Sequence, residues 1–181
     1  MKKYQSLTDE KIVDLVLKDK EIYAIIIDRY QEKLKKYVYY LTGDKEKVND
    51  IVQNTFIKVY INLNSFNKKL KFSSWLYRIA HNETINFVRK ESFFKKIDFN
   101  FFVNLADEKE IDIEIDKKLL EKKLNQCLDK LSYEYREVLF LHFLEEKNYD
   151  EISDILRISK NLVGVRINRA KKKLKIICQE N

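Results

Sequence analysis

The chain has 181 residues, of which 45% are apolar and 13% aromatic, and it carries a formal charge of +7. An apolar fraction of this size supports a packed core and excludes a wholly disordered chain, while the length allows one domain or two small ones. The sequence contains no proline and two glycines. Because sheet proteins use both residues in their turns, the composition favours helices, although an AT-rich genome would make the same residues scarce.

Export and membrane insertion are not expected. The longest uninterrupted apolar run covers residues 22–27, whereas a membrane-spanning helix needs about 18 apolar residues. The N-terminus turns polar after two lysines and lacks the apolar stretch of a secretory signal. We therefore expect a cytoplasmic protein without direct membrane insertion, in which Cys127 and Cys178 remain unpaired thiols. The spacing of these cysteines fits no metal site, and no cofactor is expected.

Charge divides the chain into three parts. Residues 1–91 hold 18 basic and 12 acidic residues, and residues 119–181 hold 13 and 10. Between them, residues 98–116 hold seven acids and a single base. This distribution predicts two small basic domains, at 1–91 and 117–181, joined by an acidic linker at 92–116. A basic chain of this kind favours nucleic acid as its partner.

The first half has the periodicity and the end signals of helices. Thr8 precedes a helix whose first turn is acidic, which suits the positive end of the helix dipole. A second helix is expected over 21–41, with Gly43 at its end and Asp44 as the cap of the next helix. The helix after Asp44 has its apolar positions at steps of three and four, which place them on one face. These positions are Val48, Ile51, Val52, Thr55, Phe56, Val59, Tyr60 and Leu63.

Other segments extend the helical pattern. Residues 62–71 are polar and basic, so we expect a loop there, followed by a helix that Ser73 caps. In the second half, helices are expected to begin near Lys117, after Ser132, at Tyr149 and after Ser159. Together these patterns predict an all-α fold with two small helical domains.

Residues 149–174 carry the strongest local signal. They predict two helices joined by a short turn, with apolar residues that can pack the two together, which is the helix-turn-helix arrangement. In that arrangement the second helix enters the major groove of DNA. Eight basic residues and no acid lie between Arg157 and Lys175, and basic groups on a helix neutralise phosphates. The alternative is an ordinary helical hairpin with a solvated basic face.

A second group of residues combines aromatic rings, positive charges and amides. Rings stack on unpaired bases while lysine and arginine hold the backbone, so this combination indicates a site for single-stranded nucleic acid. For Trp75, a buried core position is an equally good interpretation. The group consists of Lys68, Lys69, Lys71, Phe72, Trp75, Tyr77, Arg78, Asn82, Asn86, Arg89 and Lys90.

These strings together resemble a known family. Two parts of the sequence resemble regions of bacterial sigma factors. The resemblance to region two lies in DIVQNTF at 50–56, FSSWLYRIAHN at 72–82 and Arg89, and the resemblance to region four lies in residues 149–174. The order, spacing and total length resemble the extracytoplasmic-function (ECF) group of RNA polymerase sigma factors. The resemblance implies an all-helical subunit that directs RNA polymerase core to promoters and performs no catalysis of its own.

The resemblance also implies a role for each surface. Family members press one helix face against the clamp helices of the polymerase β′ subunit. In this sequence that face corresponds to Asp50, Gln53, Asn54 and Ile57. The loop at 62–71 corresponds to one that captures a flipped base. The residues implied to open the minus-ten element and to hold its non-template strand are Lys68, Lys69, Lys71, Trp75, Tyr77, Arg78, Asn82, Asn86, Arg89 and Lys90. Those expected to bind the minus-thirty-five element are Ser159, Lys160, Asn161, Arg166, Asn168, Arg169, Lys171 and Lys172.

Further partners follow from the same resemblance. They are promoter DNA, the β flap of polymerase and an anti-sigma factor that holds the protein inactive. The acidic segment at 92–116 corresponds to a linker that threads the active-site and RNA-exit channels of polymerase. A solvated tether is the alternative for this segment.

The sequence departs from the family pattern in the helix-turn-helix. Arg157 stands at a turn position where relatives often have glycine, and a side chain there would cost roughly 1 kcal/mol if the backbone adopts a positive φ. Gly164 and Val165 stand where many relatives have a basic residue and a serine. The minus-thirty-five preference therefore cannot be transferred from relatives. His81 is expected to be an ordinary surface or packing residue.

Other classes of protein fit parts of the sequence. A stand-alone helix-turn-helix regulator would bind duplex DNA as a dimer without polymerase, but it leaves the strings at 50–56 and 72–82 unexplained. A helical protein that binds another protein is a further alternative. An enzyme is not expected, because the sequence has no P-loop, no nucleophile–base pair suggested by spacing and no metal cluster.

Overall fold

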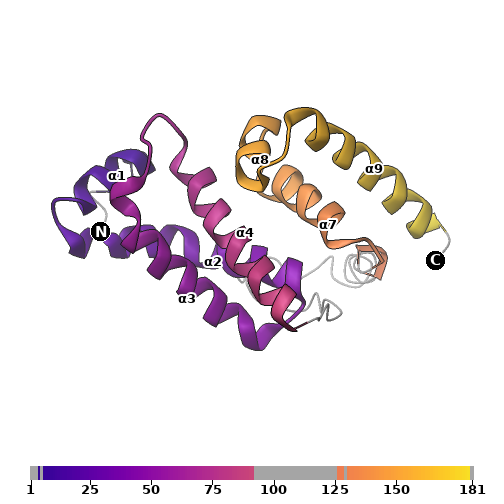
Figure 1. Cartoon of the computed structure of the whole chain (residues 1–181), viewed down its shortest axis with the longest axis horizontal. Coiled ribbons are helices and arrows are strands. Elements are labelled where there is room, and N and C mark those ends of the chain that lie inside the picture. Colours follow the sequence, from indigo (N-terminus) through magenta and orange to yellow (C-terminus); the bar gives the residue numbers. More distant parts are fainter. Residues whose placement is uncertain (1–3, 5, 92–125, 129, 180–181) are drawn as a thin grey trace, which may run out of the picture.

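The computed structural model describes residue 4 and residues 6–91, 126–128 and 130–179. The regular elements in these ranges are helices, so the all-α prediction is confirmed for the described part of the chain (Figure 1). The predicted linker at 92–116 lies outside the described residues. The elements in chain order are α1 (Asp9–Val16), η2 (Lys20–Ile22), α2 (Tyr23–Thr42), α3 (Lys45–Ile61), η3 (Leu63–Ser65), α4 (Phe72–Glu91), α7 (Tyr133–Leu139), η4 (Phe140–Leu144), α8 (Tyr149–Leu156) and α9 (Lys160–Gln179).

The helix ends in the first half are mostly those that the sequence predicts. The Thr8 hydroxyl accepts a hydrogen bond from the Lys11 N–H at 3.4 Å, at the start of α1. Gly43 ends α2 in the left-handed conformation with φ of 67°. The Asp44 carboxylate then accepts from the first free N–H groups of α3. These predictions are confirmed because each depends on one residue and its immediate neighbours.

The start of α4 differs from the prediction that Ser73 caps it. The helix begins at Phe72, whose N–H donates to the Glu10 carboxylate of α1 at 3.0 Å. The cap therefore comes from a residue 62 positions earlier, which local sequence signals do not reveal. The helix expected near Lys117 is described only at residues 126–128, which are helical.

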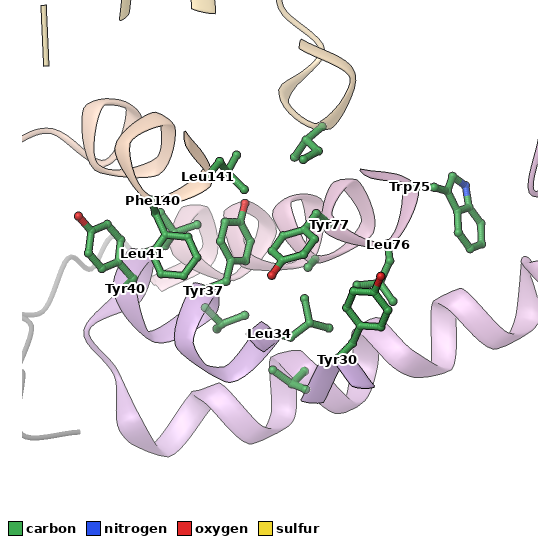
Figure 2. Packing of buried hydrophobic residues seen from close by; sticks show 14 of the residues in the cluster. Tyr30, Leu34, Tyr37, Tyr40, Leu41, Trp75, Leu76, Tyr77, Phe140 and Leu141 are labelled. Atoms are coloured by element: carbon green, nitrogen blue, oxygen red, sulfur yellow. The ribbon is translucent and has the colours of Figure 1, made fainter. Parts of the chain in front are cut away.

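Helices α1 to α4 form the N-terminal domain around an aromatic core. Tyr37, Leu34 and Leu76 are fully buried between α2 and α4 (Figure 2). The predicted apolar stripe of α3 faces this core, since its members are buried apart from Tyr60. The opposite face of α3 is consequently left at the surface.

Helices α7, α8 and α9 form the C-terminal domain with the predicted helix-turn-helix. Ile152 and Ile155 of α8 pack with Val163 and Ile167 of α9 in a fully buried cluster. Arg157 ends α8 in the left-handed conformation, with φ of 55° and ψ of 42°. The chain therefore turns sharply between α8 and α9, as a helix-turn-helix requires.

The prediction of unpaired thiols is wrong. Cys127 and Cys178 form a disulfide with a Cα–Cα distance of 5.4 Å. They are 51 residues apart in sequence, but the last turn of α9 returns to the helical turn at 126–128. This pairing is a consequence of the tertiary fold, and the spacing of the cysteines gives no sign of it.

The two domains pack against each other. Helix α8 lies along α4, and α7 lies against α2 (Figure 1). The Phe140 ring packs between the rings of Tyr37 and Tyr40 (Figure 2). Its centroid lies 5.6 Å from that of Tyr37 and 4.9 Å from that of Tyr40. Within the described ranges, none of the helices combines the length and the apolar character needed to cross a membrane.

Candidate nucleic-acid and polymerase interfaces

The surface of α3 that faces away from the core carries the predicted polymerase-binding residues. Asp50, Gln53, Asn54 and Ile57 are all exposed, and Ile57 keeps 49% of its surface accessible. Residues at steps of three and four share one side of a helix. The structure therefore brings these four residues together at the surface.

A groove of about 750 Å³ lies beside this surface, between α2 and α3. The predicted residues Gln53 and Ile57 line one side of it, and Ala24 and Ile27 of α2 line the other. Sequence reasoning missed the α2 residues because they belong to an apolar run that reads as core. Exposed apolar side chains gathered in one groove are typical of a protein-binding surface.

A second pocket, of about 540 Å³, lies between the end of α3, η3 and α4. It brings together predicted minus-ten residues that are far apart along α4, namely Trp75, Asn82, Asn86 and Arg89. The polar lining also includes Asn62 and Ser65 at the start of the predicted loop, His81, and Lys58 of α3, which pairs with Glu83 of α4 at 2.5 Å. Sequence reasoning assigned no role to Lys58, because it lies on a different helix. The pocket offers amide, guanidinium and ring surfaces to a ligand.

The aromatic residues of this group are buried. Trp75 is 8% exposed, and its ring lies 5.3 Å from that of Phe66 and 5.8 Å from that of Phe72. Trp75 nevertheless contributes to the lining of the pocket. Tyr77 is completely buried, with its ring against that of Tyr37 at 5.2 Å. In this conformation Tyr77 therefore does not present its ring to DNA.

Burial also fixes the ionisation of these phenols. The pKa of Tyr77 lies well above its usual value because of burial and because of the nearby Glu145 carboxylate. The pKa of Tyr37 is raised for the same reasons, with Glu137 as the neighbouring carboxylate. Both hydroxyls consequently stay protonated at neutral pH, and that of Tyr37 donates to Glu137.

The predicted lysines of the loop lie at the surface. Lys68 pairs with Asp14 of α1. Lys69 is exposed, and its N–H donates to the Asn67 side chain at 3.0 Å. Lys71 pairs with Glu151 of the C-terminal domain at 3.1 Å. The side chain of Lys90 is outside the described part.

Arg78 and His81 of α4 face the C-terminal domain. The Arg78 guanidinium donates to the Asp154 carboxylate at 2.9 Å. Burial lowers the pKa of Arg78, while the Asp154 charge acts in the opposite direction. His81 Nδ1 lies 2.6 Å from Glu137 Oε1, which also accepts from the Tyr37 hydroxyl at 2.5 Å. His81 is therefore a packing residue, as expected, but it packs between domains.

Helix α9 presents part of the predicted minus-thirty-five group on one face. Asn161, Asn168 and Lys172 are exposed and lie opposite the buried side of the helix, with Arg169 next to them. Val165 is exposed on the same face. The face thus combines amides, positive charge and one apolar side chain.

The remaining members of the group lie at the edges of that face. The Ser159 hydroxyl accepts from the Leu162 N–H at 3.2 Å and so caps α9. Lys160 pairs with Asp150 at 2.8 Å, and the half-buried Arg166 lies 3.8 Å from Glu134. Lys171 stands over the Phe143 ring, 5.0 Å from its centroid. Gly164 faces the Tyr149 ring, which would lie 3.4 Å from an added Cβ atom.

The fold is thus a helix-turn-helix domain joined to a helical bundle with an exposed apolar groove, an arrangement that combines a DNA-binding motif with a surface suited to a protein partner. Residues 26–94 match Sigma-70 region 2, and residues 121–174 match Sigma-70 region 4. The chain is 34% identical to the ECF RNA polymerase sigma factor SigW of Bacillus subtilis in an alignment 170 residues long that covers 87% of this chain and 89% of that protein. It is 32% identical to the ECF RNA polymerase sigma-E factor of Escherichia coli in an alignment 180 residues long that covers 92% of each chain.

The chain therefore belongs to the ECF-type RNA polymerase sigma factors, which direct polymerase to promoters and are not enzymes. Two solved structures share its fold at 20% identity. One is CnrH in complex with the cytosolic domain of CnrY, with a TM-score of 0.70 over 96% of this chain and 98% of that one. The other is RpoE from Bartonella quintana in complex with the anti-sigma factor NepR, with a TM-score of 0.65 over 84% and 98%.

Proposed function

We propose that the groove between α2 and α3 receives the clamp helices of the polymerase β′ subunit. Exposed Ile57 beside apolar α2 residues carries this proposal, because apolar surface in a groove is stabilised by burial against a partner. Gln53 and Asn54 lie one turn from Ile57 and Asp50 two turns away on the same face, and these polar side chains can form hydrogen bonds at the rim of the contact. The resulting complex is the promoter-selecting form of polymerase.

The pocket between α3, η3 and α4 is proposed to hold the non-template strand of the minus-ten element. Asn82 and Asn86 offer hydrogen bonds to base edges, and Arg89 supplies positive charge for the backbone, whereas Lys58 is paired with Glu83 at 2.5 Å. The mostly buried Trp75 contributes an apolar part of the wall. A base flipped into this pocket would recover part of its unstacking cost through these contacts.

The exposed face of α9 is proposed to bind the minus-thirty-five element as duplex DNA. Asn161 and Asn168 are placed to reach base edges, while Lys172 and Arg169 neutralise phosphates. Val165 adds an apolar contact of the kind that recognises a thymine methyl group. The base preference is therefore expected to differ from that of relatives with a serine at this position.

Further partners are proposed for the C-terminal domain and the linker. The β flap of polymerase is the expected partner of the C-terminal domain, and an anti-sigma factor is expected to restrain the whole chain in the cytoplasm. CnrH and the RpoE protein, which share this fold, were both solved with partner proteins. The passage of residues 92–116 through the polymerase channels stays a prediction.

Run-off transcription with purified polymerase core tests the proposed function. Wild-type chain should add start sites, and Ile57→Glu should lose core binding by about tenfold or more, because a charge replaces the apolar anchor. Leu17→Glu is the matched control, since Leu17 is an exposed apolar residue of α1's C-terminus outside the groove. A wild-type chain that binds promoter duplex but never core would favour the stand-alone regulator.

Asn82→Ala separates promoter opening from binding to polymerase. The side chain is exposed, so its loss should leave the fold and core affinity intact while reducing opening of the minus-ten element. Trp75→Ala is a poor choice for the same purpose, because removing a buried tryptophan costs about 3–5 kcal/mol of stability. Equal losses of core binding and opening in Asn82→Ala would contradict the proposed role of the pocket.

A further inference from the structure

The pocket between α3, η3 and α4 contains a carboxylate to which the proposed function gives no role. Glu83 of α4 lines this pocket together with Asn82 and Asn86, and it is the only acid among the described residues of the lining. A carboxylate repels the phosphates of a nucleic acid. An acid in a strand-binding pocket therefore lowers the affinity for DNA unless it makes a favourable contact of its own.

An ion pair between two helices holds the Glu83 carboxylate in place. Lys58 of α3 donates to Glu83 Oε1 at 2.5 Å, across the contact between α3 and α4 (Figure 1). The Glu83 side chain is 14% exposed and that of Lys58 is 51% exposed, so the acid is the more enclosed partner. A carboxylate has two oxygens with about four acceptor sites. Glu83 can therefore accept a further hydrogen bond from a ligand while it remains paired with Lys58.

Glu83 and the neighbouring amides give the pocket a defined hydrogen-bonding pattern. Ile79, Asn82, Glu83 and Asn86 follow one another at steps of three and four, so they share one face of α4. An ionised carboxylate accepts hydrogen bonds and cannot donate them, whereas the side-chain amide of asparagine can donate. This face therefore presents an acceptor next to donors.

Cytosine and adenine carry the complement of this pattern. A flipped base is read along its Watson–Crick edge, where each of these two bases has an amino group that donates beside a ring nitrogen that accepts. Thymine has a carbonyl oxygen in place of the amino group, and that oxygen would face the carboxylate. Guanine has an amino group, but an N–H rather than an acceptor lies beside it on this edge. The pattern therefore favours cytosine and adenine and opposes thymine.

We propose that Glu83 is a specificity-determining residue of this pocket: it selects cytosine or adenine over thymine for the base held there, and Lys58 is the positioning residue that orients its carboxylate. The inference rests on the proposed minus-ten role of the pocket. Rejection of thymine comes from an unfavourable contact, which is an effective source of specificity. The same charge guides the strand, because its phosphates are repelled by Glu83 and attracted by the exposed Arg89.

Binding of single-stranded oligonucleotides to the holoenzyme tests the selection. The probes are a fluorescent oligothymidine of about 12 nucleotides and the same strand with one central cytosine or one central adenine. A strand of otherwise identical bases can slide until the preferred base reaches the pocket. After the binding of polymerase core alone is subtracted, the cytosine and adenine strands should bind about fivefold more tightly than oligothymidine. Equal affinities for the three probes would overturn the proposal.

Glu83→Gln keeps the size of the side chain and removes its charge. The preference should disappear and oligothymidine should bind more tightly, because the new amide can donate to a thymine oxygen. Glu46→Gln is the matched control, since Glu46 is an exposed acid in the first turn of α3 and does not line the pocket. This control should keep the wild-type preference. A preference that survives Glu83→Gln would show that another residue selects the base, against the proposal.

Lys58→Gln separates base selection from a merely structural ion pair. Every probe should bind more weakly, because the carboxylate is no longer neutralised, yet the cytosine and adenine strands should stay preferred over oligothymidine. Identical effects of Lys58→Gln and Glu83→Gln on all probes would mean that the pair only joins α3 to α4, and the proposal would fail.

The same measurements distinguish this proposal from the proposed function. A holoenzyme that binds none of the probes more tightly than core alone would overturn the strand-binding role of the pocket, and the role of Glu83 with it. A holoenzyme that binds all three probes more tightly than core, but equally, would overturn the role of Glu83 and leave the strand-binding role intact.

Discussion

Arg157 is one of two non-glycine residues with a positive φ in the described part of the chain, the other being Glu146. Arg157 lies in the left-handed conformation at the end of α8, where glycine carries no steric penalty. Its side chain is exposed and lies 3.7 Å from Asp154, a distance at which an exposed pair contributes little. The ion pair of Arg157 therefore offsets little of the backbone strain that a side chain causes at this positive φ.

Replacing Arg157 by glycine should consequently stabilise the protein. We expect Arg157→Gly to raise the free energy of unfolding by about 1 kcal/mol, measured by urea denaturation, because the Cβ clash at positive φ disappears. Arg157→Ala is the control, since it removes the charge but keeps the Cβ atom. Equal stabilities for the glycine and alanine variants would show that the backbone is unstrained here.

Helix α9 is tied at both of its ends. Ser159 caps its first turn, and the Cys127–Cys178 disulfide joins its last turn to residues 126–128. Between these ends, Gly164 replaces a better helix former at a cost of about 1 kcal/mol and leaves room for the Tyr149 ring. The helix proposed to read DNA is therefore stabilised by its two ends and by its buried face rather than by its own propensity.

Reduction of the disulfide should destabilise the C-terminal domain. A cross-link that spans 51 residues restricts the unfolded chain and contributes about 2–4 kcal/mol to stability. Thermal unfolding followed by circular dichroism should therefore show a lower midpoint in the presence of dithiothreitol. The Cys127→Ser/Cys178→Ser double variant should unfold at that lower midpoint with or without the reductant, and an unchanged wild-type midpoint would contradict the prediction.

Across the whole molecule, Glu137 connects elements of both domains. It is 1% exposed in α7 and lies within hydrogen-bonding distance of Tyr37 of α2 and His81 of α4. Buried polar groups that lose a partner retain their desolvation cost. The stability of one domain is thus linked to the presence of the other.

Glu137→Ala should therefore lower the stability of the N-terminal domain although the change is made in the C-terminal one. We expect a loss of about 1–3 kcal/mol, because the Tyr37 hydroxyl and His81 both lose their common partner. Trp75 is the single tryptophan and lies in the N-terminal domain, so its fluorescence during urea unfolding reports the effect. Glu134→Ala, a half-buried acid of the same helix, is the control, and an unmoved Trp75 transition in Glu137→Ala would refute the linkage.

The fold could be predicted from the sequence wherever a short segment determines the structure. The caps at Thr8 and Asp44, the end at Gly43 and the span of α8 are correct because their signals are local. The exposed set on α3 followed from its periodicity. Partners that are distant in sequence, such as those of Asp154 and Cys178, could not be predicted, because periodicity specifies a face but not what covers it.

The cap that Glu10 provides has a consequence for the order in which the N-terminal domain forms during synthesis. Helix α1 leaves the ribosome first, yet its Glu10 carboxylate accepts from the Phe72 N–H, 62 positions later. Asp9, next to it, binds Arg29 and Tyr30 of α2 and so holds α1 in place. Helix α1, the first to be synthesised, thus caps the N-terminus of α4, the last helix of the domain. A nascent chain that ends before Phe72 lacks this contact, which ties folding to completion of the domain rather than to growth helix by helix.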